Sequence, residues 1–175
     1  MKKLNLGCGK DIRPGWINLD CVKLPGIDIV HDLTSIPLPF EDNAFDEVLC
    51  QDVLEHIEYV PVLREIHRIL KPGGKVTIRV PHFSSSDAYA DPTHHRYFSI
   101  HTFRYFILED ERSYYFDFHF SKIESIKLYF QKRLAYFYNI FLEPIINLNK
   151  RMQNYYEKSP LRIFPAWNLE VILIK

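Results

Sequence analysis

A Gly-Cys-Gly turn at residues 7–9 follows a short apolar run near the start of the chain. Glycines at such a turn let the backbone approach a ligand closely and adopt positive φ angles. A dinucleotide site would need a third glycine at position 12 and a helix directly after the turn, but the chain has Ile12 and then Arg13, Pro14 and Gly15. The turn therefore predicts a ligand that lacks a pyrophosphate.

Two carboxylates follow the next two apolar segments. Asp20 ends the segment 16–19, and Asp32 follows the segment 27–30. An ionised carboxylate only accepts hydrogen bonds, so Asp20 can accept from both hydroxyls of a ribose. Asp32 can accept from the amino group of an adenine, while the backbone N–H of Leu33 can donate to a ring nitrogen. Because ligands of open α/β sheets bind at the carboxyl ends of strands, these residues predict an adenosine site. Each acid can alternatively be a plain cap at a strand end.

Strands alternating with a helix must position these groups. Asp52 is expected to cap a helix that ends near residue 70, with Glu55 completing a capping box. A further strand then precedes a change of pattern after residue 81. This alternation predicts an α/β fold with a parallel sheet. The expected strands cover residues 2–6, 16–19, 27–30, 45–50, 75–80 and 168–174.

The second half of the chain is rich in aromatic residues. Residues 99–108 are expected to form a short helix, residues 115–129 show strand-like alternation, and residues 130–157 have a helical pattern that Pro144 must kink or break. The apolar side chains of that last segment predict core or a lid, with a dimer face or a membrane-surface contact as alternatives. They are Leu134, Phe137, Phe141, Ile145, Leu148 and Met152.

Five motifs occur in order at residues 4–10 (LNLGCGK), 18–20 (NLD), 31–33 (HDL), 45–57 (FDEVLCQDVLEHI) and 70–74 (LKPGG). Together they resemble the motifs of class I S-adenosylmethionine-dependent methyltransferases, most closely the methyltransferase type 11 group. The resemblance covers roughly residues 3–82. It implies a Rossmann-like fold: a mostly parallel seven-stranded sheet with helices on both faces and an antiparallel C-terminal strand.

The same resemblance implies S-adenosylmethionine as the cofactor. The backbone turn would pass beneath its methionine part, Asp20 would bind the ribose, and Asp32 with Leu33 would meet the adenine. Gln51 and Asp52 would line the space near the sulfonium, and Lys10 would lie near the methionine carboxylate, although the short first crossover leaves Arg13 as an alternative. The implied cofactor-binding residues are Leu6, Gly7, Cys8, Gly9, Lys10, Asp20, Asp32, Leu33, Gln51 and Asp52.

A histidine-rich segment follows the last parallel strand, where the methyl group should be. A hydroxyl acceptor would need a general base, for which histidine is suited near neutral pH. The candidates are His94 or His95, with Asp91 as the orienting acid, and then His82. No metal site is expected, because adjacent histidines point apart and no ligand spacing is present. A structural role for the segment is the main alternative.

The composition sets limits on partners and location. The formal net charge is zero, so no strong nucleic-acid signal is present. Three unpaired cysteines and the lack of a signal peptide or transmembrane segment predict a cytoplasmic protein. We expect one domain, 1–175, with residues 82–165 as a substrate-side cap, and a possible homodimer.

Three functions remain open from the sequence. The first is methylation of a small or carbohydrate-like oxygen or nitrogen acceptor, with the aromatic-rich half supplying an apolar pocket. The second is a non-catalytic methyltransferase-like binding or regulatory subunit. The third is an RNA methyltransferase that works with a partner.

Overall fold

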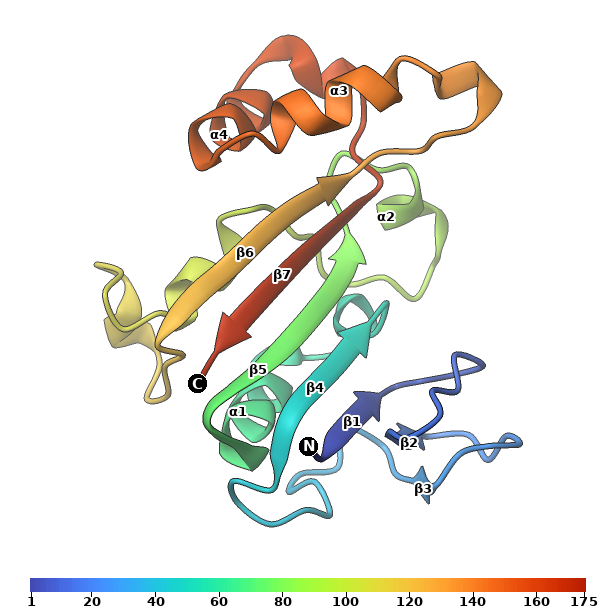
Figure 1. Ribbon diagram of the computed structural model, residues 1–175, viewed down its shortest axis with the longest axis vertical. Coiled ribbons are helices and arrows are strands. Elements are labelled where there is room, and N and C mark those ends of the chain that lie inside the picture. Colours follow the sequence, from blue (N-terminus) through green and yellow to red (C-terminus); the bar gives the residue numbers. More distant parts are fainter.

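The computed structural model describes residues 1–175 and is built on a seven-stranded sheet with the order β3-β2-β1-β4-β5-β7-β6 (Figure 1). Strands β1 to β5 run parallel, whereas β7 is antiparallel to both of its neighbours. This arrangement confirms the expected Rossmann-like class. The strands are β1 (Lys3–Leu6), β2 (Ile17–Asp20), β3 (Ile29–Val30), β4 (Phe45–Gln51), β5 (Leu70–Pro81), β6 (Lys122–Tyr129) and β7 (Asn168–Ile174).

Four α-helices and five 3₁₀ turns complete the fold. The helices are α1 (Tyr59–Ile69), α2 (Asp87–Ala90), α3 (Asn139–Ile146) and α4 (Lys150–Lys158). The 3₁₀ turns are η1 (Leu54–His56), η2 (Thr102–Phe106), η3 (Ser113–Tyr115), η4 (Leu134–Tyr136) and η5 (Pro160–Ile163). The longest helix, α1, has 11 residues, and none of the helices combines the length and apolar character that crossing a bilayer requires.

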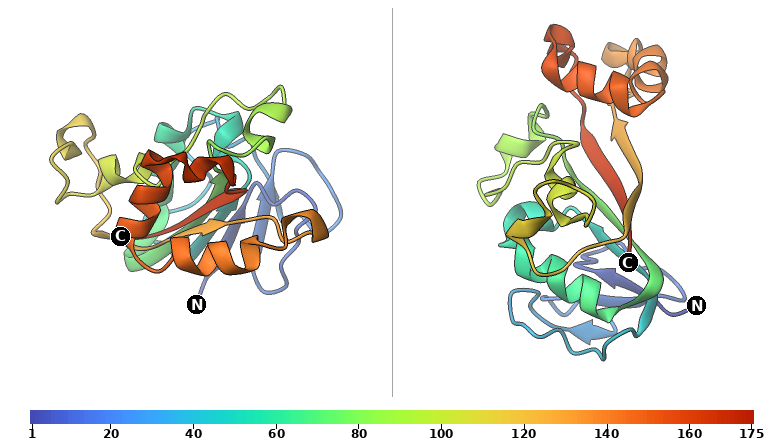
Figure 2. Two further views of the ribbon diagram at one scale, coloured as in Figure 1. Left: turned by 90° about the horizontal axis from the view of Figure 1, so that it is seen from above. Right: turned by 90° about the vertical axis from the view of Figure 1, so that its left-hand side faces the viewer.

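The hydrophobic core lies on one face of the sheet. Along β5, Val76 and Ile78 are fully buried, while Thr77 and Arg79 point the other way and are partly exposed. Figure 2 shows α1 and the connection from β5 to β6 on the core side, and no helix on the opposite face of the central strands. Helices on both faces were expected. The difference arises because the crossovers between β1 and β4 contain no helix, and the alternation along β5 matches a sheet with one polar face.

Two buried asparagines hold the first crossover, which has no helix, as its short length indicated. Asn5 and Asn18 are 2% and 3% exposed. The Asn5 amide donates to the backbone oxygen of Asp11 at 2.7 Å, and the Asn18 oxygen accepts the backbone N–H of Arg13 at 3.0 Å. The loop over β1 and β2 is therefore held by side chains instead of by helical hydrogen bonds.

The helix after β4 begins later than expected. Val53 precedes the turn η1, and Glu58 precedes α1, with no capping hydrogen bond from either side chain. Asp52 is not a cap, because its backbone is left-handed, with φ of 53°. The predicted capping box with Glu55 is therefore wrong.

The helical region near the C-terminus divides after Ile146, between α3 and α4, and not at Pro144, which lies inside α3. The buried positions of α3 include polar Asn139 and Glu143, which bond to the segment after β6. The expectation that the apolar side chains form core is wrong: Phe141 is 69% exposed and Leu148 is 74% exposed. Strand β6 also lies inside the expected cap, residues 82–165, so only part of that segment can cover the sheet end.

An ion pair on α1 replaces the missing helix between β3 and β4. Arg68 donates to the backbone oxygens of Leu38 and Phe40, at 3.2 and 2.8 Å. The Glu65 carboxylate accepts from Arg68 at 2.7 Å and from the backbone N–H of Leu38 at 2.8 Å. The hydrogen bonds from Arg68 hold the pKa of Glu65 below its ordinary value. The pair thus fixes the loop 38–42 on the helix.

Replacing Glu65 with Gln should lower the free energy of unfolding by about 2 kcal/mol at neutral pH, because the change leaves Arg68 without its charged partner. A depressed pKa contributes stability above the ordinary value of 4.5, and this is lost as the pH falls through the folded value. The deficit should therefore shrink in acid. Urea unfolding at several pH values measures it, with the exposed Glu41→Gln as the matched control. Equal losses in the two variants would contradict the prediction.

Candidate functional site

The turn at the end of β1 is shaped by two glycines with different surroundings. Gly7 has φ of 62°, and a Cβ at this position would clash with the side chain of Val53. Gly9 has φ of 50°, but a Cβ there would meet no heavy atom within 4 Å. Gly7 is therefore required for packing against the segment after β4, whereas Gly9 borders open space at the carboxyl end of the sheet.

Asp20, at the end of β2, faces this turn. Its Oδ2 accepts the backbone N–H of Gly9 at 2.7 Å, and its Oδ1 accepts that of Val22 at 3.0 Å. Oδ1 also accepts from the Cys21 thiol at 3.6 Å, whereas Oδ2 has no second partner and retains capacity for a ligand hydroxyl. The structure thus brings together the turn and the first of the two acids.

Asp32 lies after β3 in an Asx turn. Its Oδ1 accepts from the backbone N–H and the hydroxyl of Thr34, both at 2.8 Å, and these bonds lower the pKa of Asp32. The carboxylate is therefore ionised at neutral pH, with Oδ2 available. Leu33, the next residue, is buried in the core at 7% exposure.

A guanidinium lies between the first loop and the end of β4. Arg13 donates to Gln51 Oε1 at 2.8 Å and to Asp11 Oδ2 at 2.9 Å. Lys10, in contrast, is exposed. Asp52 pairs with Arg79 from β5, through Oδ2 and Nη2. Arg13 is consequently better placed than Lys10 to offer a cation at this edge of the sheet.

Cys8 lies between the two glycines and is 5% exposed. Burial, and then the nearby Asp20 carboxylate, raise the pKa of its thiol. The thiol therefore stays protonated, which fits a residue of small size beside the turn and not a nucleophile.

Glu55, in η1, is a buried carboxylate without a partner. The residue is 1% exposed, and neither of its oxygens has a hydrogen-bond partner. Burial raises the pKa of Glu55 to about 7, and the Asp52 carboxylate adds to this rise. From the sequence, Glu55 was expected only as part of a capping box at the start of the helix. The signal in the sequence was an acid four residues after the end of β4, which does not reveal that the side chain is buried.

The histidine-rich loop is attached to η1. The backbone N–H groups of His95 and Arg96 donate to the backbone oxygen of Glu55, at 2.8 and 3.2 Å. The His94 ring lies edge-on against His56, with their centroids 4.6 Å apart. His94 Nε2 is 3.9 Å from Asp91 Oδ2, so these two expected catalytic residues are neighbours. His95 is exposed beside them.

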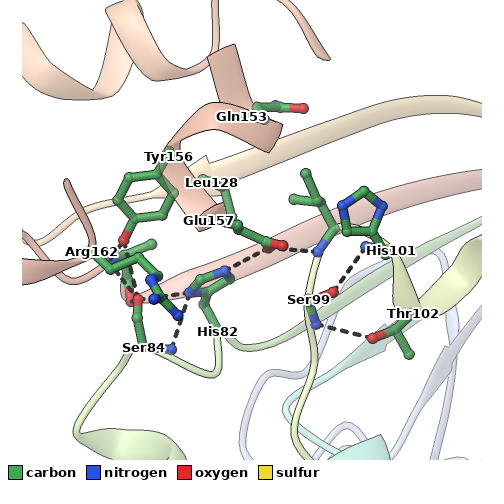
Figure 3. Close-up of polar contacts among 12 residues, drawn as sticks. His82, Ser84, Ser99, His101, Thr102, Leu128, Gln153, Tyr156, Glu157 and Arg162 are labelled. Atoms are coloured by element: carbon green, nitrogen blue, oxygen red, sulfur yellow. Dashed lines mark hydrogen bonds and ion pairs between the residues drawn. The ribbon is translucent and has the colours of Figure 1, made fainter. Parts of the chain in front are cut away.

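His82 lies elsewhere, in a buried hydrogen-bond network between β5 and α4 (Figure 3). It is fully buried, with Nε2 2.9 Å from Glu157 Oε1 and Nδ1 2.7 Å from Ser84 Oγ. Glu157 also accepts the backbone N–H of Ile100 at 2.8 Å. With both ring nitrogens engaged, the geometry favours a structural role for His82 over the catalytic role that we expected.

A cavity of about 850 Å³ lies between η2, β6 and α4. Polar and charged side chains form most of its lining, so it does not match the apolar pocket expected from the aromatic-rich half. They include Arg104, Asp110, Lys122, Gln153, Asn154 and Lys158.

Comparisons with known proteins concern mainly the first half of the chain. A family model described as a methyltransferase domain matches residues 8–78. An uncharacterised protein of Methanocaldococcus jannaschii is 58% identical over 43 residues, which are 25% of this chain and 19% of that protein. A demethylmenaquinone methyltransferase of Bacillus mycoides is 37% identical over 63 residues, 35% of this chain and 26% of the relative. The chain thus spans about a quarter or less of these relatives' length.

The fold is shared over nearly the whole chain. A crystal structure of a SAM-dependent methyltransferase from Archaeoglobus fulgidus superposes on 99% of this chain and 86% of its own, with a TM-score of 0.64 at 17% identity. The open space at Gly9 and the carboxylates of Asp20 and Asp32 also fit the chemistry of an adenosine with a methionine tail. The chain therefore resembles a methyltransferase domain over residues 8–78 and shares the fold of a SAM-dependent methyltransferase over almost its whole length.

Proposed function

We propose that this protein transfers the methyl group of S-adenosylmethionine to an oxygen or nitrogen of a small or carbohydrate-like acceptor. The observation that carries the proposal is the contact between Asp20 and the Gly9 N–H at 2.7 Å, which joins a carboxylate to a turn bordered by open space. A ribose at the carboxylate would leave the methionine tail over the turn.

The cofactor contacts follow from this placement. Asp20 binds the ribose hydroxyls, and Asp32 accepts from the adenine amine beside the Leu33 N–H. Arg13 takes the methionine carboxylate in preference to Lys10, because its guanidinium already reaches the end of β4. Gln51 and Asp52 lie at that strand end, beside the space assigned to the sulfonium.

When bound, the cofactor supplies a methyl group on a good leaving group, so the protein has mainly to align the acceptor and exclude water. The loop 82–98, held on η1 through the Glu55 carbonyl, forms one wall. His94, with Asp91 beside it, is the base that we retain for a hydroxyl acceptor, and exposed His95 is the second choice. The absence of net charge favours a small acceptor over a nucleic acid. The three cysteines are free, in keeping with the proposed cytoplasmic location.

Asp20→Asn should weaken binding of S-adenosylhomocysteine roughly 10- to 100-fold, because a charged acceptor of the ribose hydroxyls is removed. The amide can still accept a backbone N–H, so the fold should be kept. Calorimetry measures the affinity, and Asp117→Asn, in an exposed ion pair with Arg64, is the matched control. A wild-type protein that binds neither S-adenosylmethionine nor its product would refute the proposed function.

The two glycines should respond differently to replacement by Ala. Gly7→Ala should lower the free energy of unfolding by about 3 kcal/mol, because the added methyl group clashes with Val53 and φ is positive. Gly9→Ala should lower the free energy of unfolding by only about 1 kcal/mol, because of its positive φ. The same change should weaken the binding of S-adenosylhomocysteine at least about tenfold, because the added methyl group occupies the open space. Denaturant unfolding and calorimetry separate the effects. Wild-type affinity in Gly9→Ala would show that no ligand passes over this turn.

A further inference from the structure

A cluster of metal-ligating side chains lies where the loop 82–98 meets η1. Glu55, His56 and His94 each offer one ligand atom, and these three atoms lie within 4.8 Å of one another. Two ligands at about 2.1 Å from a tetrahedral ion are about 3.4 Å apart. A movement of under about one ångström by each side chain would therefore bring all three atoms onto a common ion.

The carboxylate of this cluster lacks any other partner. Glu55 is 1% exposed, and both of its oxygens are shielded from solvent without a hydrogen bond. Leaving a buried carboxylate unpaired is costly unless it is neutralised, paired with a cation or bound to a metal. The other two members of the cluster are imidazoles, which can share a divalent cation with it.

Hydrogen bonds fix the proton of His56. The Thr93 hydroxyl donates to Asp91 Oδ1 at 2.6 Å, because an ionised carboxylate can only accept. The same hydroxyl must then accept from His56 Nδ1, which is 2.8 Å away. His56 consequently carries its proton on Nδ1, and its Nε2 has a free lone pair.

His94 is oriented in a similar way. Its Nδ1 lies 3.3 Å from the backbone oxygen of Ala88, which is an acceptor only, so the proton is again on Nδ1. The lone pair of Nε2 is free, and Asp91 Oδ2 lies 3.9 Å from it. Metal-binding histidines in proteins usually donate their other N–H to a carbonyl or to another oxygen acceptor in this manner.

The two segments that carry the ligands are already held together. His95 and Arg96 donate backbone N–H groups to the Glu55 carbonyl, and Arg96 pairs with Glu58. The positions of η1 and the loop are therefore set before any ion binds. Such preorganisation lowers the entropic cost of assembling a site.

We propose that Glu55, His56 and His94 bind one divalent first-row transition metal ion. Two imidazoles and one carboxylate are a donor set that suits Zn²⁺, Fe²⁺, Co²⁺ or Mn²⁺ and leaves coordination positions open. This inference replaces the expectation from the sequence that the chain holds no metal. This inference rests on the proposed function, in which the open positions would take an oxygen or nitrogen of the methyl acceptor. With its Nε2 lone pair on the ion, His94 would be a ligand and not a base, so the base for a hydroxyl acceptor would then be exposed His95.

The test uses tag-free full-length protein that has been treated with a chelator and titrated with Co²⁺ by calorimetry and absorption. One ion per chain and a rise in melting temperature are expected. Glu55→Gln, which keeps the shape of the side chain, should weaken the binding of Co²⁺ at least about tenfold and abolish the rise in melting temperature. Its metal-free form should melt no lower than wild type, because the buried unpaired carboxyl is gone. His94→Gln should weaken the binding of Co²⁺ by a similar factor.

His101→Gln is the matched control, since His101 lies in the same region but bonds to Asn154 and is outside the cluster. No binding of Co²⁺ or Zn²⁺ by wild type, or wild-type affinity in Glu55→Gln, would overturn the metal site. An equal loss in His101→Gln would do so too, because the ion would then lie elsewhere. Binding of S-adenosylhomocysteine, measured on the same samples, tests the proposed function separately. If the protein binds Co²⁺ but not S-adenosylhomocysteine, the proposed methyltransferase function is refuted and the metal site stands.

Discussion

The left-handed backbone at Asp52 is the constraint on which the arrangement of this site depends. A non-glycine residue with φ of 53° is uncommon and costs free energy unless its surroundings hold it in place. Here the backbone N–H of Asp52 donates to the Arg79 carbonyl at 2.8 Å, and its carboxylate pairs with the same residue's guanidinium. This turn directly follows the end of β4 at Gln51 and leads into η1. Val53 then packs against Gly7, and the Glu55 carbonyl becomes available to the loop 82–98.

Side-chain networks take the place of a helical layer in this protein. Parallel sheets are usually covered on both faces by the helices of their crossovers. Three of the crossovers here contain no helix, and buried polar groups hold two of them instead: Asn5 with Asn18 over β1 and β2, and Arg68 with Glu65 below the loop 38–42. The consequence is a sheet whose second face carries ion pairs, such as Glu47 with Lys3 and Lys75. A chain of 175 residues thus keeps the strand order of its class with fewer helices.

Features set by residues close together in the sequence could be predicted, whereas features that depend on distant residues could not. The strands at the glycine turn and around β4 were predictable because their apolar runs are short and end in turn residues or acids. The start of α1 was not predictable, because the backbone at Asp52 depends on Arg79, which lies 27 residues further along the chain. On α3, helical spacing correctly grouped the apolar side chains on one face, but that face is exposed and does not point to the core. The opposite face points inward, because Asn139 and Glu143 bond to backbone groups after β6.

The same limit applies to the site. Asp20 could be placed near Gly9 from strand order alone, whereas the proximity of His94 to Glu55 required the loop after β5 to fold back over η1. His82 shows the opposite error, because a histidine at a strand end has the right sequence position for a base, yet its partner Glu157 comes from α4. A polar side chain at a strand end is therefore informative only when its competing partners are known. Glu55 differs from these residues because it is buried, lies beside two imidazoles and has no hydrogen-bond partner. An ion shared with those imidazoles would compensate the buried carboxylate.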